Sequence, residues 1–408
     1  MDQLQLVVST AFGLESVVAR ELRQLGYEPL GTEDGQILIN GDLQAICRTN
    51  LWLRSAERVG ILIGTFDAVD FDELFDQVKV LPWEAWIGVD DKFPVTCKVQ
   101  RSSIRSGVNA QKMVKRAIVE RLRSQYTRHW FAETGREYEV HCDILRDSVL
   151  LTIDTTGPGL HKRGYRREVG EAPLRETLAA GLVQLSYWNR ERFLVDPFCG
   201  SGTIPIEAAL IGRNMAPGRN RHFTAVDWPQ LPRELWKQAL QEARDLERPA
   251  LSPAISGSDL DGRAIKQARR HALDAGVGAD IEFSVRPFVE LPSARDFGVM
   301  IANPPYGERM GERREVEQLY KDMGELMTML ETWSYYVLTS APNFERLFGR
   351  RADRRRKLFN GPIECTYYQY QGPRPPRELE TSDDSVHGEA AEPPSDTASE
   401  AMDEQDWD

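Results

Sequence analysis

Four consecutive residues, Asn303-Pro-Pro-Tyr306, carry groups that could activate an aromatic amine. They follow an apolar segment, residues 299–302, which we expect to be a buried strand. Two prolines in a row end the strand and fix the backbone just beyond it. The amide oxygen of Asn303 and the carbonyl of Pro304 could accept both hydrogens of an exocyclic amine, while Tyr306 offers a flat face to the base. We expect the catalytic residues to be Asn303, Pro304, Pro305 and Tyr306.

Residues 193–203, Phe-Leu-Val-Asp-Pro-Phe-Cys-Gly-Ser-Gly-Thr, predict a second part of the same site. An apolar strand ends at Val195, a glycine turn follows, and a helix begins at Thr203. Gly200 and Gly202 allow positive φ and a close approach to a ligand, toward which the helix directs free N–H groups. Because ligands bind at the carboxyl ends of strands in open parallel sheets, we expect both stretches to face one crevice. Together they resemble class I S-adenosylmethionine-dependent methyltransferases that modify exocyclic amines of bases.

This resemblance implies S-adenosylmethionine as the cofactor. The turn would hold its methionine end with Asp196 on the ammonium, and Asp259 would hold the ribose hydroxyls. Asp261 is the alternative at that position, although a helix cap is the favoured interpretation. Cys199 lies in the cofactor turn, so we interpret it as a packed side chain and not as a nucleophile. The expected cofactor-binding residues are Asp196, Phe198, Cys199, Gly200, Ser201, Gly202, Thr203, Asp259 and Asn303.

One part of the cofactor site departs from the resembling fold. Arg286-Pro287 stand where that fold usually places an acid for the adenine amine. Adenine recognition would then fall to backbone groups near Phe288. The sequence has no His, Cys and carboxylate pattern that predicts a metal site, and direct methyl transfer needs none.

A basic stretch, residues 98–123, holds eight Lys or Arg residues and a single acid, Glu120. One-sided charge favours phosphate contacts over a merely solvated helix face. Two further basic runs, residues 162–167 and 350–357, are candidates for either RNA contact or solvated surface. The residues expected to bind RNA are Lys98, Arg101, Arg105, Lys112, Lys115 and Arg116.

Residues 96–123 resemble the THUMP domain, an RNA-binding module of RNA-modifying enzymes. Three segments, residues 159–167 (Gly-Leu-His-Lys-Arg-Gly-Tyr-Arg-Arg), 172–180 (Ala-Pro-Leu-Arg-Glu-Thr-Leu-Ala-Ala) and 354–365, resemble the bacterial large-subunit ribosomal RNA guanine-N2 methyltransferases of the RlmL type. The resemblance covers about residues 1–372 and implies methyl transfer to N2 of a guanosine, with 23S rRNA favoured as the substrate. Guanine-N2 methylation of tRNA, adenine-N6 methylation and an inactive RNA-binding assembly factor are the alternatives.

Strand and helix alternate along the chain, which predicts an α/β protein. We expect a Rossmann-like doubly wound methyltransferase domain preceded by an α+β region of ferredoxin-like and THUMP type. Residues 213–254 interrupt the alternation and form an insertion. The expected domains are an N-terminal ferredoxin-like domain (1–70), a THUMP domain (71–157), a methyltransferase domain (158–372) and a disordered acidic tail (373–408).

The composition favours a soluble cytoplasmic protein. The 408 residues are 41% hydrophobic, and they contain no apolar run of membrane-spanning length and no secretory signal pattern. Five scattered cysteines without a Cys-x-x-Cys pair indicate a reducing compartment. The net charge is −12, but residues 373–408 hold twelve Asp or Glu against two Arg, so the body is close to neutral and can carry basic faces.

Overall fold

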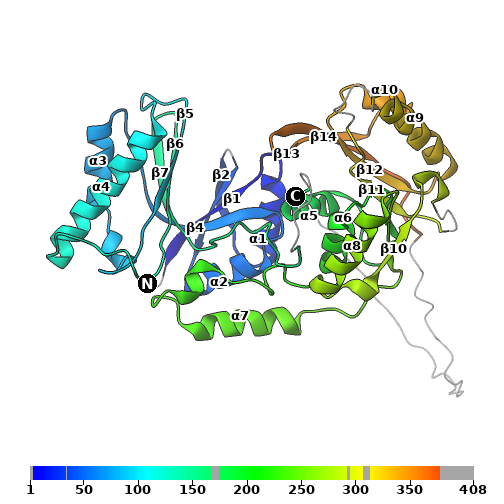
Figure 1. Ribbon diagram of the computed structural model, residues 1–408. Helices are drawn as coiled ribbons and strands as arrows, with labels where there is room; N and C mark the ends of the chain where they lie inside the picture. Colours follow the sequence, from blue (N-terminus) through cyan, green and yellow to red (C-terminus); the bar gives the residue numbers. More distant parts are fainter. Residues whose placement is uncertain (1–2, 34, 167–173, 292–294, 307–312, 377–408) are drawn as a thin grey trace, which may run out of the picture. The chain divides into compact units, whose positions relative to one another are not determined.

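The computed structural model describes residues 3–33, 35–166, 174–291, 295–306 and 313–376 (Figure 1). Residues 1–373 form one compact unit, and residues 374–408 form a second, of which 374–376 are described. Beyond residue 376, the expected acidic tail lies outside the described residues. Among the described helices, none combines the length and apolar character that crossing a membrane requires.

The first part of the chain is built on one seven-stranded sheet in the order β2-β3-β1-β4-β7-β6-β5. Strand β4 connects the half of this sheet that contains β1 to β3 with the half that contains β5 to β7. It pairs with β1 through residues 56–61 and with β7 through residues 60–67. The boundary expected at residue 70 falls just beyond this shared strand. The strands are β1 (Leu4–Thr10), β2 (Pro29–Glu33), β3 (Gln36–Gly41), β4 (Ala56–Asp67), β5 (Val95–Gln100), β6 (Val140–Leu145) and β7 (Ser148–Asp154).

Polar residues start three of the four helices in this part. The carboxylates of Asp42 and Asp70 and the hydroxyl of Ser106 each accept a hydrogen bond from a backbone N–H in the first turn of their helix. The helix entered from Ser106 buries one apolar face, while its Lys and Arg residues lie largely outside that face. The helices are α1 (Glu15–Gln24), α2 (Leu43–Trp52), α3 (Phe71–Val80) and α4 (Gly107–Tyr126).

The second sheet has the order β10-β9-β8-β11-β12-β14-β13. Its first five strands are parallel neighbours, whereas β14 runs antiparallel to both β12 and β13. This confirms the doubly wound sheet expected from the alternation and the antiparallel last strand expected from the resemblance. The strands are β8 (Leu194–Asp196), β9 (Ile255–Asp259), β10 (Ile281–Val285), β11 (Val299–Ala302), β12 (Ser334–Thr339), β13 (Arg354–Asn360) and β14 (Ile363–Tyr370).

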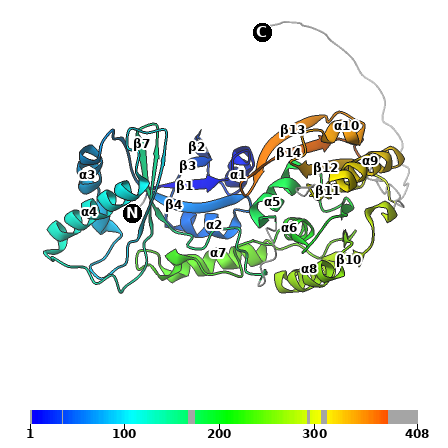
Figure 2. The same cartoon turned by 45° about the horizontal axis from the view of Figure 1, so that its top comes forward.

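Both faces of this sheet are buried, so its central strands are apolar throughout. Leu194 and Ile301 face one hydrophobic cluster and Val195 and Met300 the other, as the alternation of side chains along a strand requires. Helices α5 (Glu176–Leu185), α6 (Thr203–Gly212) and α8 (Gly262–Ala275) cover the first face. Helices α9 (Arg313–Met329) and α10 (Phe344–Phe348) cover the second (Figure 2).

The insertion at residues 213–254 packs against the N-terminal sheet and its helices. Its helix α7 (Arg233–Asp245) lies along α2 (Figure 1), and Arg48 of α2 donates to both carboxylate oxygens of Glu242 at 2.9 and 2.7 Å. Just before α7, the ring of Trp228 stacks on Tyr138 with centroids 4.4 Å apart. The insertion therefore joins the part of the chain built on the second sheet to the N-terminal part, a role that its sequence did not indicate.

The basic run at residues 162–167 is only partly exposed where it is described: Lys162 is exposed, whereas Arg163 is buried. Arg163 is 3% exposed, and its guanidinium lies 3.4 Å from the carboxylate of Glu207, which is completely buried on α6. Tyr165 donates to the same carboxylate at 3.1 Å, and Arg163 also donates to the carbonyls of Leu160 and Arg54. The run thus supplies a buried link between the two parts of the chain.

Arg166 continues this link toward the cofactor turn. It donates a hydrogen bond to the hydroxyl of Thr203 at the start of α6 and forms a 3.3 Å ion pair with Glu176 at the start of α5. Arg167 lies outside the described residues.

Candidate active site

Three polar residues stand at the carboxyl ends of adjacent parallel strands. Asp196 is the last residue of β8, Asp259 is the last residue of β9, and Asn303 directly follows β11. Because β8 lies between the other two strands and parallel strands are about 4.8 Å apart, the three strand ends lie within about 10 Å. The order of the sheet reverses beside β8, which is where open α/β sheets bind ligands.

The glycine turn after β8 is closed on one side and open on the other. Gly202 has a φ of 86°, and a Cβ there would lie 3.0 Å from Ala268 and 3.1 Å from the ring of Phe283. Gly200 has a φ of 49°, and a Cβ there would meet no atom of the described residues within 4 Å. The turn therefore packs tightly on α8 at Gly202 and faces open space at Gly200. Among the described residues no side chain caps α6, which leaves its first N–H groups for an anion.

The carboxyl group of Asp196 is buried in a place where a cationic partner would stabilise its ionised form. The residue is 1% exposed, and its Oδ1 accepts a hydrogen bond from the backbone N–H of Phe198 at 3.1 Å. Burial raises the pKa of Asp196 well above its usual range, and the nearby charge of Asp259 adds to this effect. A bound ammonium would offset the cost of the buried negative charge and favour the ionised form.

Asp259 and Asp261 have different local roles. Asp259 accepts from Gly200 N–H at 2.9 Å through one oxygen and from Asp261 N–H at 2.9 Å through the other. The carboxylate of Asp261 accepts from Arg263 N–H at 2.8 Å, so it caps α8 as the favoured interpretation predicted. Between the two acids, Leu260 is 74% exposed and offers an apolar surface beside the cofactor turn.

Sequence reasoning overlooked Leu260, although an apolar residue between two acids at a strand end was a usable signal. Across the same edge, the rings of Phe198 and Phe288 lie 5.6 Å apart.

The Asn-Pro-Pro-Tyr segment is held by hydrogen bonds from two tyrosines. Tyr306 donates its hydroxyl to Oδ1 of Asn303 at 2.6 Å. Tyr320 of α9 donates to the carbonyl of Pro305 at 3.0 Å and lies 2.9 Å from the hydroxyl of Thr339. Since a carbonyl oxygen has two lone pairs, Asn303 Oδ1 keeps one for a substrate amine. Sequence reasoning did not find Tyr320, because the segment gives no sign of what packs behind it.

The hydroxyl of Tyr306 points into the protein, where Cys365 on β14 donates its thiol to it at 3.6 Å. Burial raises the pKa of Tyr306, so its hydroxyl stays protonated and remains a donor. Glu308 and Arg309, considered as loop supports or phosphate contacts, lie outside the described residues.

Cys199 is buried in the cofactor turn, and a Cβ on Gly257 would lie 3.3 Å from its sulfur. Burial raises the pKa of its thiol, which disfavours the thiolate that a nucleophile needs. These observations support the packed-side-chain interpretation.

Comparison with known proteins assigns three parts of the chain to known families. Residues 163–369 match the family model described as RMKL-like methyltransferase domain, residues 5–60 match the RlmL ferredoxin-like domain, and residues 68–154 match the THUMP domain. The chain belongs to the RMKL-like methyltransferase family. It is accordingly an S-adenosylmethionine-dependent RNA methyltransferase.

Two relatives and one solved structure illustrate the similarity. "Putative RNA methyltransferase YpsC" of Bacillus subtilis is 47% identical over 91% of this chain and 96% of its own length. "Ribosomal RNA large subunit methyltransferase K/L" of Syntrophotalea carbinolica is 37% identical over 86% of this chain but only 51% of its own length. The crystal structure "SMU.472, a putative methyltransferase complexed with SAH" has a TM-score of 0.87 and 39% identity, and the match covers 92% of this chain and all of that one.

The basic residues that we expect to bind RNA in this RMKL-like methyltransferase differ in how far their charges are already engaged by other groups of the protein. The ammonium of Lys115 is already engaged within the protein. It donates to the Phe93 carbonyl at 2.8 Å, pairs with Glu133 at 2.7 Å and lies 3.4 Å from the centre of the Phe93 ring. Arg121 is likewise paired with Glu84 at 2.5 Å.

Exposed cations remain around the start of α4, namely Arg101, Arg105, Lys112 and Arg116. Lys112 and Arg116 are one turn apart and are neighbours on the helix surface. Lys98 is also exposed, but it alternates along β5 with Val99, which faces the start of α4 near Gly107. Lys98 therefore lies on the other face of the sheet.

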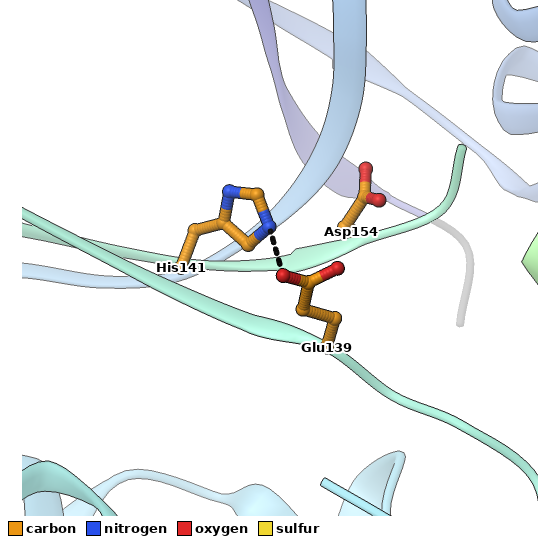
Figure 3. Close-up of side chains that lie close together, drawn as sticks. All are labelled: Glu139, His141 and Asp154. Carbon is orange, nitrogen blue, oxygen red and sulfur yellow. Dashed lines mark ion pairs between the residues drawn. The ribbon is translucent and has the colours of Figure 1, made fainter. Parts of the chain in front are cut away.

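A cluster in the THUMP region of this methyltransferase brings Glu139, His141 and Asp154 together, with potential metal-ligating atoms within 4.8 Å of one another (Figure 3). His141 Nε2 lies 3.3 Å from Glu139. The oxygens of Asp154, however, already accept hydrogen bonds from Arg58 at 2.6 Å and from backbone N–H groups of the following turn. Asp154 of this cluster therefore anchors the turn that leaves β7.

Proposed function

We propose that the protein transfers a methyl group from S-adenosylmethionine to the exocyclic N2 amine of a guanosine in RNA, with 23S rRNA as the substrate. The observation that carries this proposal is the position of Asn303 Oδ1. It is oriented by Tyr306 and stands at a strand end next to the strand that ends in the buried Asp196.

The residues around the glycine turn fit the cofactor. When bound, S-adenosylmethionine supplies an electrophilic methyl group on its sulfonium. The buried carboxylate of Asp196 suits the ammonium, and the free N–H groups at the start of α6 suit the carboxylate. Each oxygen of Asp259 keeps a lone pair for a ribose hydroxyl. The exposed apolar side chain of Leu260 suits one face of the adenine ring.

The chain's role in the reaction is to orient the amine. The N2 lone pair of guanine is delocalised into the ring, which makes the amine a poor nucleophile. Asn303 Oδ1 and the carbonyl of Pro304 would accept the two amine hydrogens, which opposes this delocalisation and directs the lone pair toward the methyl group. Tyr320 holds the next carbonyl, that of Pro305, and so fixes the segment in one conformation.

RNA would approach over the exposed cations Arg101, Arg105, Lys112 and Arg116, which can contact phosphates. A ribosomal substrate is supported by the matching relatives that are named ribosomal RNA large subunit methyltransferases. Lys98, on the opposite sheet face, and Lys115, engaged by Glu133, would contribute less to this surface.

The test compares the protein with its Asn303→Ala variant on rRNA and tRNA purified from a strain that lacks the gene. Mass spectrometry of the nucleosides should show new N2-methylguanosine in the large-subunit rRNA with the unaltered protein. The variant should lose about 10²- to 10³-fold in rate while its cofactor affinity, measured by calorimetry, changes little. Asn40→Ala, at an exposed asparagine of β3, is the matched control and should behave like the unaltered protein.

Each other result has a definite meaning. Full activity of Asn303→Ala would refute the role given to the amide. New N2-methylguanosine confined to tRNA, or new N6-methyladenosine, would replace the proposed substrate with one of the alternatives.

A further inference from the structure

Two phenylalanines far apart in the sequence form an exposed aromatic pair. Phe12 follows β1 and is 55% exposed. Its ring meets that of Phe359 on β13 edge to face, with centroids 5.8 Å apart and planes at 81°. Phe359 is only partly buried. The N-terminal part and the methyltransferase part of the chain thus each contribute one ring.

The strand register places this pair at the active-site edge of the second sheet. Strand β12 ends at Thr339 opposite Thr366, but β13 and β14 remain paired for three more residues on each strand, up to Asn360 opposite Ile363. At about 3.3 Å per residue, the hairpin extends about 10 Å beyond β12. Because β12 is parallel to β11, this overhang lies on the edge where Asn303 stands.

A side-chain contact connects the overhang to the catalytic segment. Cys365, which pairs with Leu358 within the overhang, donates its thiol to the hydroxyl of Tyr306 at 3.6 Å. Three strand spacings separate β11 from β13, and Phe359 lies three residues further along than Asn303, which puts the two residues about 17 Å apart. A nucleotide close to the target base could reach the aromatic pair.

The loop that carries Phe12 is held rigidly against β13. Gly13 has a φ of 89°, and a Cβ there would overlap the carbonyl oxygen of Lys357. Arg356 donates to the Gly13 carbonyl at 2.8 Å and to the hydroxyl of Ser16 at 3.1 Å. Phe12 is therefore presented in a fixed position, so that binding costs little ordering entropy.

We infer that Phe12 and Phe359 form a stacking site for an unpaired base of the RNA strand near the target guanosine. This inference rests on the proposed function. Aromatic side chains bind single-stranded nucleic acid by stacking on base faces, which every base offers. The ammonium of Lys357 lies 5.4 Å from the centre of the Phe359 ring and pairs with Glu364 at 2.7 Å. Both side chains are at least half exposed, so a phosphate adjoining the stacked base could compete with Glu364 for this cation.

The first test measures binding of a single-stranded RNA that contains one guanosine, by fluorescence anisotropy. Phe12→Ala and Phe359→Ala should each weaken binding about 5- to 140-fold, the range for loss of one stacked base. Met329→Ala is the control, because Met329 is 72% exposed at the end of α9, near the edge of the sheet where β12 begins. It should leave the affinity unchanged. Calorimetry with S-adenosylmethionine and thermal unfolding should show no change for any of the variants.

A second measurement separates stacking from a general effect on the fold. Abasic sites are placed one at a time at the two positions on either side of the guanosine. One of them should weaken binding to the unaltered protein by a similar factor, and it should cause little further loss in Phe12→Ala or Phe359→Ala. Fully additive losses at every position would overturn the inference. Because these are binding measurements, they hold even if nucleoside analysis shows that the methylated atom is not guanine N2.

Discussion

The buried ion pair between Arg163 and Glu207 allows a quantitative test of how the two parts of the chain are joined. In Glu207→Ala, the guanidinium of Arg163 stays buried with only the carbonyls of Leu160 and Arg54 as partners, and the hydroxyl of Tyr165 loses its acceptor. Breaking a buried pair by removing one partner costs about 3–5 kcal/mol, because the other charge is left uncompensated. We expect a loss of this size in the free energy of unfolding.

The corresponding shift in melting temperature follows from the size of the compact unit. With an unfolding entropy of about 2.1 cal/mol/K per residue over about 370 residues, each kcal/mol lowers the melting temperature by about 1.3 °C. Glu207→Ala should therefore melt about 4–6 °C lower, as measured by calorimetry and by circular dichroism. Glu207 lies on the helix that begins at the cofactor turn, so the affinity for S-adenosylmethionine should fall as well.

Two further variants decide whether charge is the cause. Replacing both partners in Arg163→Met/Glu207→Leu removes the uncompensated charge, and at least half of the lost stability should return. Lys237→Ala removes an exposed pair with Glu234, in which the side chains are 74% and 69% exposed, and should not change the melting temperature measurably. The reasoning is refuted if Glu207→Ala loses less than about 1 kcal/mol, or if the double variant is as unstable as the single one.

Three other predictions concern the active site and the RNA surface. Tyr320→Phe removes the hydrogen bond to the Pro305 carbonyl, which fixes the segment 303–306, so turnover should fall about 10-fold while the cofactor affinity measured by calorimetry stays the same. An unchanged turnover would contradict this positioning role. Burial raises the pKa of Asp196, and the cofactor ammonium needs the ionised carboxylate. The affinity for S-adenosylmethionine should therefore weaken about 10-fold per pH unit as the pH falls from the raised pKa toward the ordinary value of about 3.9. Asp196→Asn should bind the cofactor weakly and independently of pH, and a pH dependence that persists in this variant would assign the effect to another group. Replacing Arg101, Arg105 and Lys112 with Ala should weaken RNA binding and reduce the slope of log K against log salt by about 2, whereas an unchanged slope would place the phosphates elsewhere.

The sequence predicts features that depend on local pattern. Apolar runs bounded by glycine and proline locate strands such as 193–195 and 299–302, and a parallel sheet then places their carboxyl ends together without further information. This is why Asp196 and Asn303 could be assigned to one edge before the structure was known. The capping role of Asp261 follows from an equally local rule.

Features that depend on tertiary partners are not predictable in this way. The pattern of α7 shows that it buries an apolar face, but not that the covering helix is α2. Likewise, basic residues look alike in a sequence, whereas the structure gives Lys115 a carboxylate and an aromatic ring and leaves Lys112 in solvent. Burial of Arg163 was missed for the same reason, since its partner Glu207 lies 44 residues away.

The strand that pairs with β1 at one end and β7 at the other sets where this protein can be divided. Cutting the chain at residue 70 would remove β4 and expose the backbone donors and acceptors of β7 along an edge that the intact protein covers. A fragment prepared from residue 71 onward is therefore prone to self-association through that edge. Chimeras that exchange the RNA-binding module between relatives should carry the whole sheet, from β1 to β7.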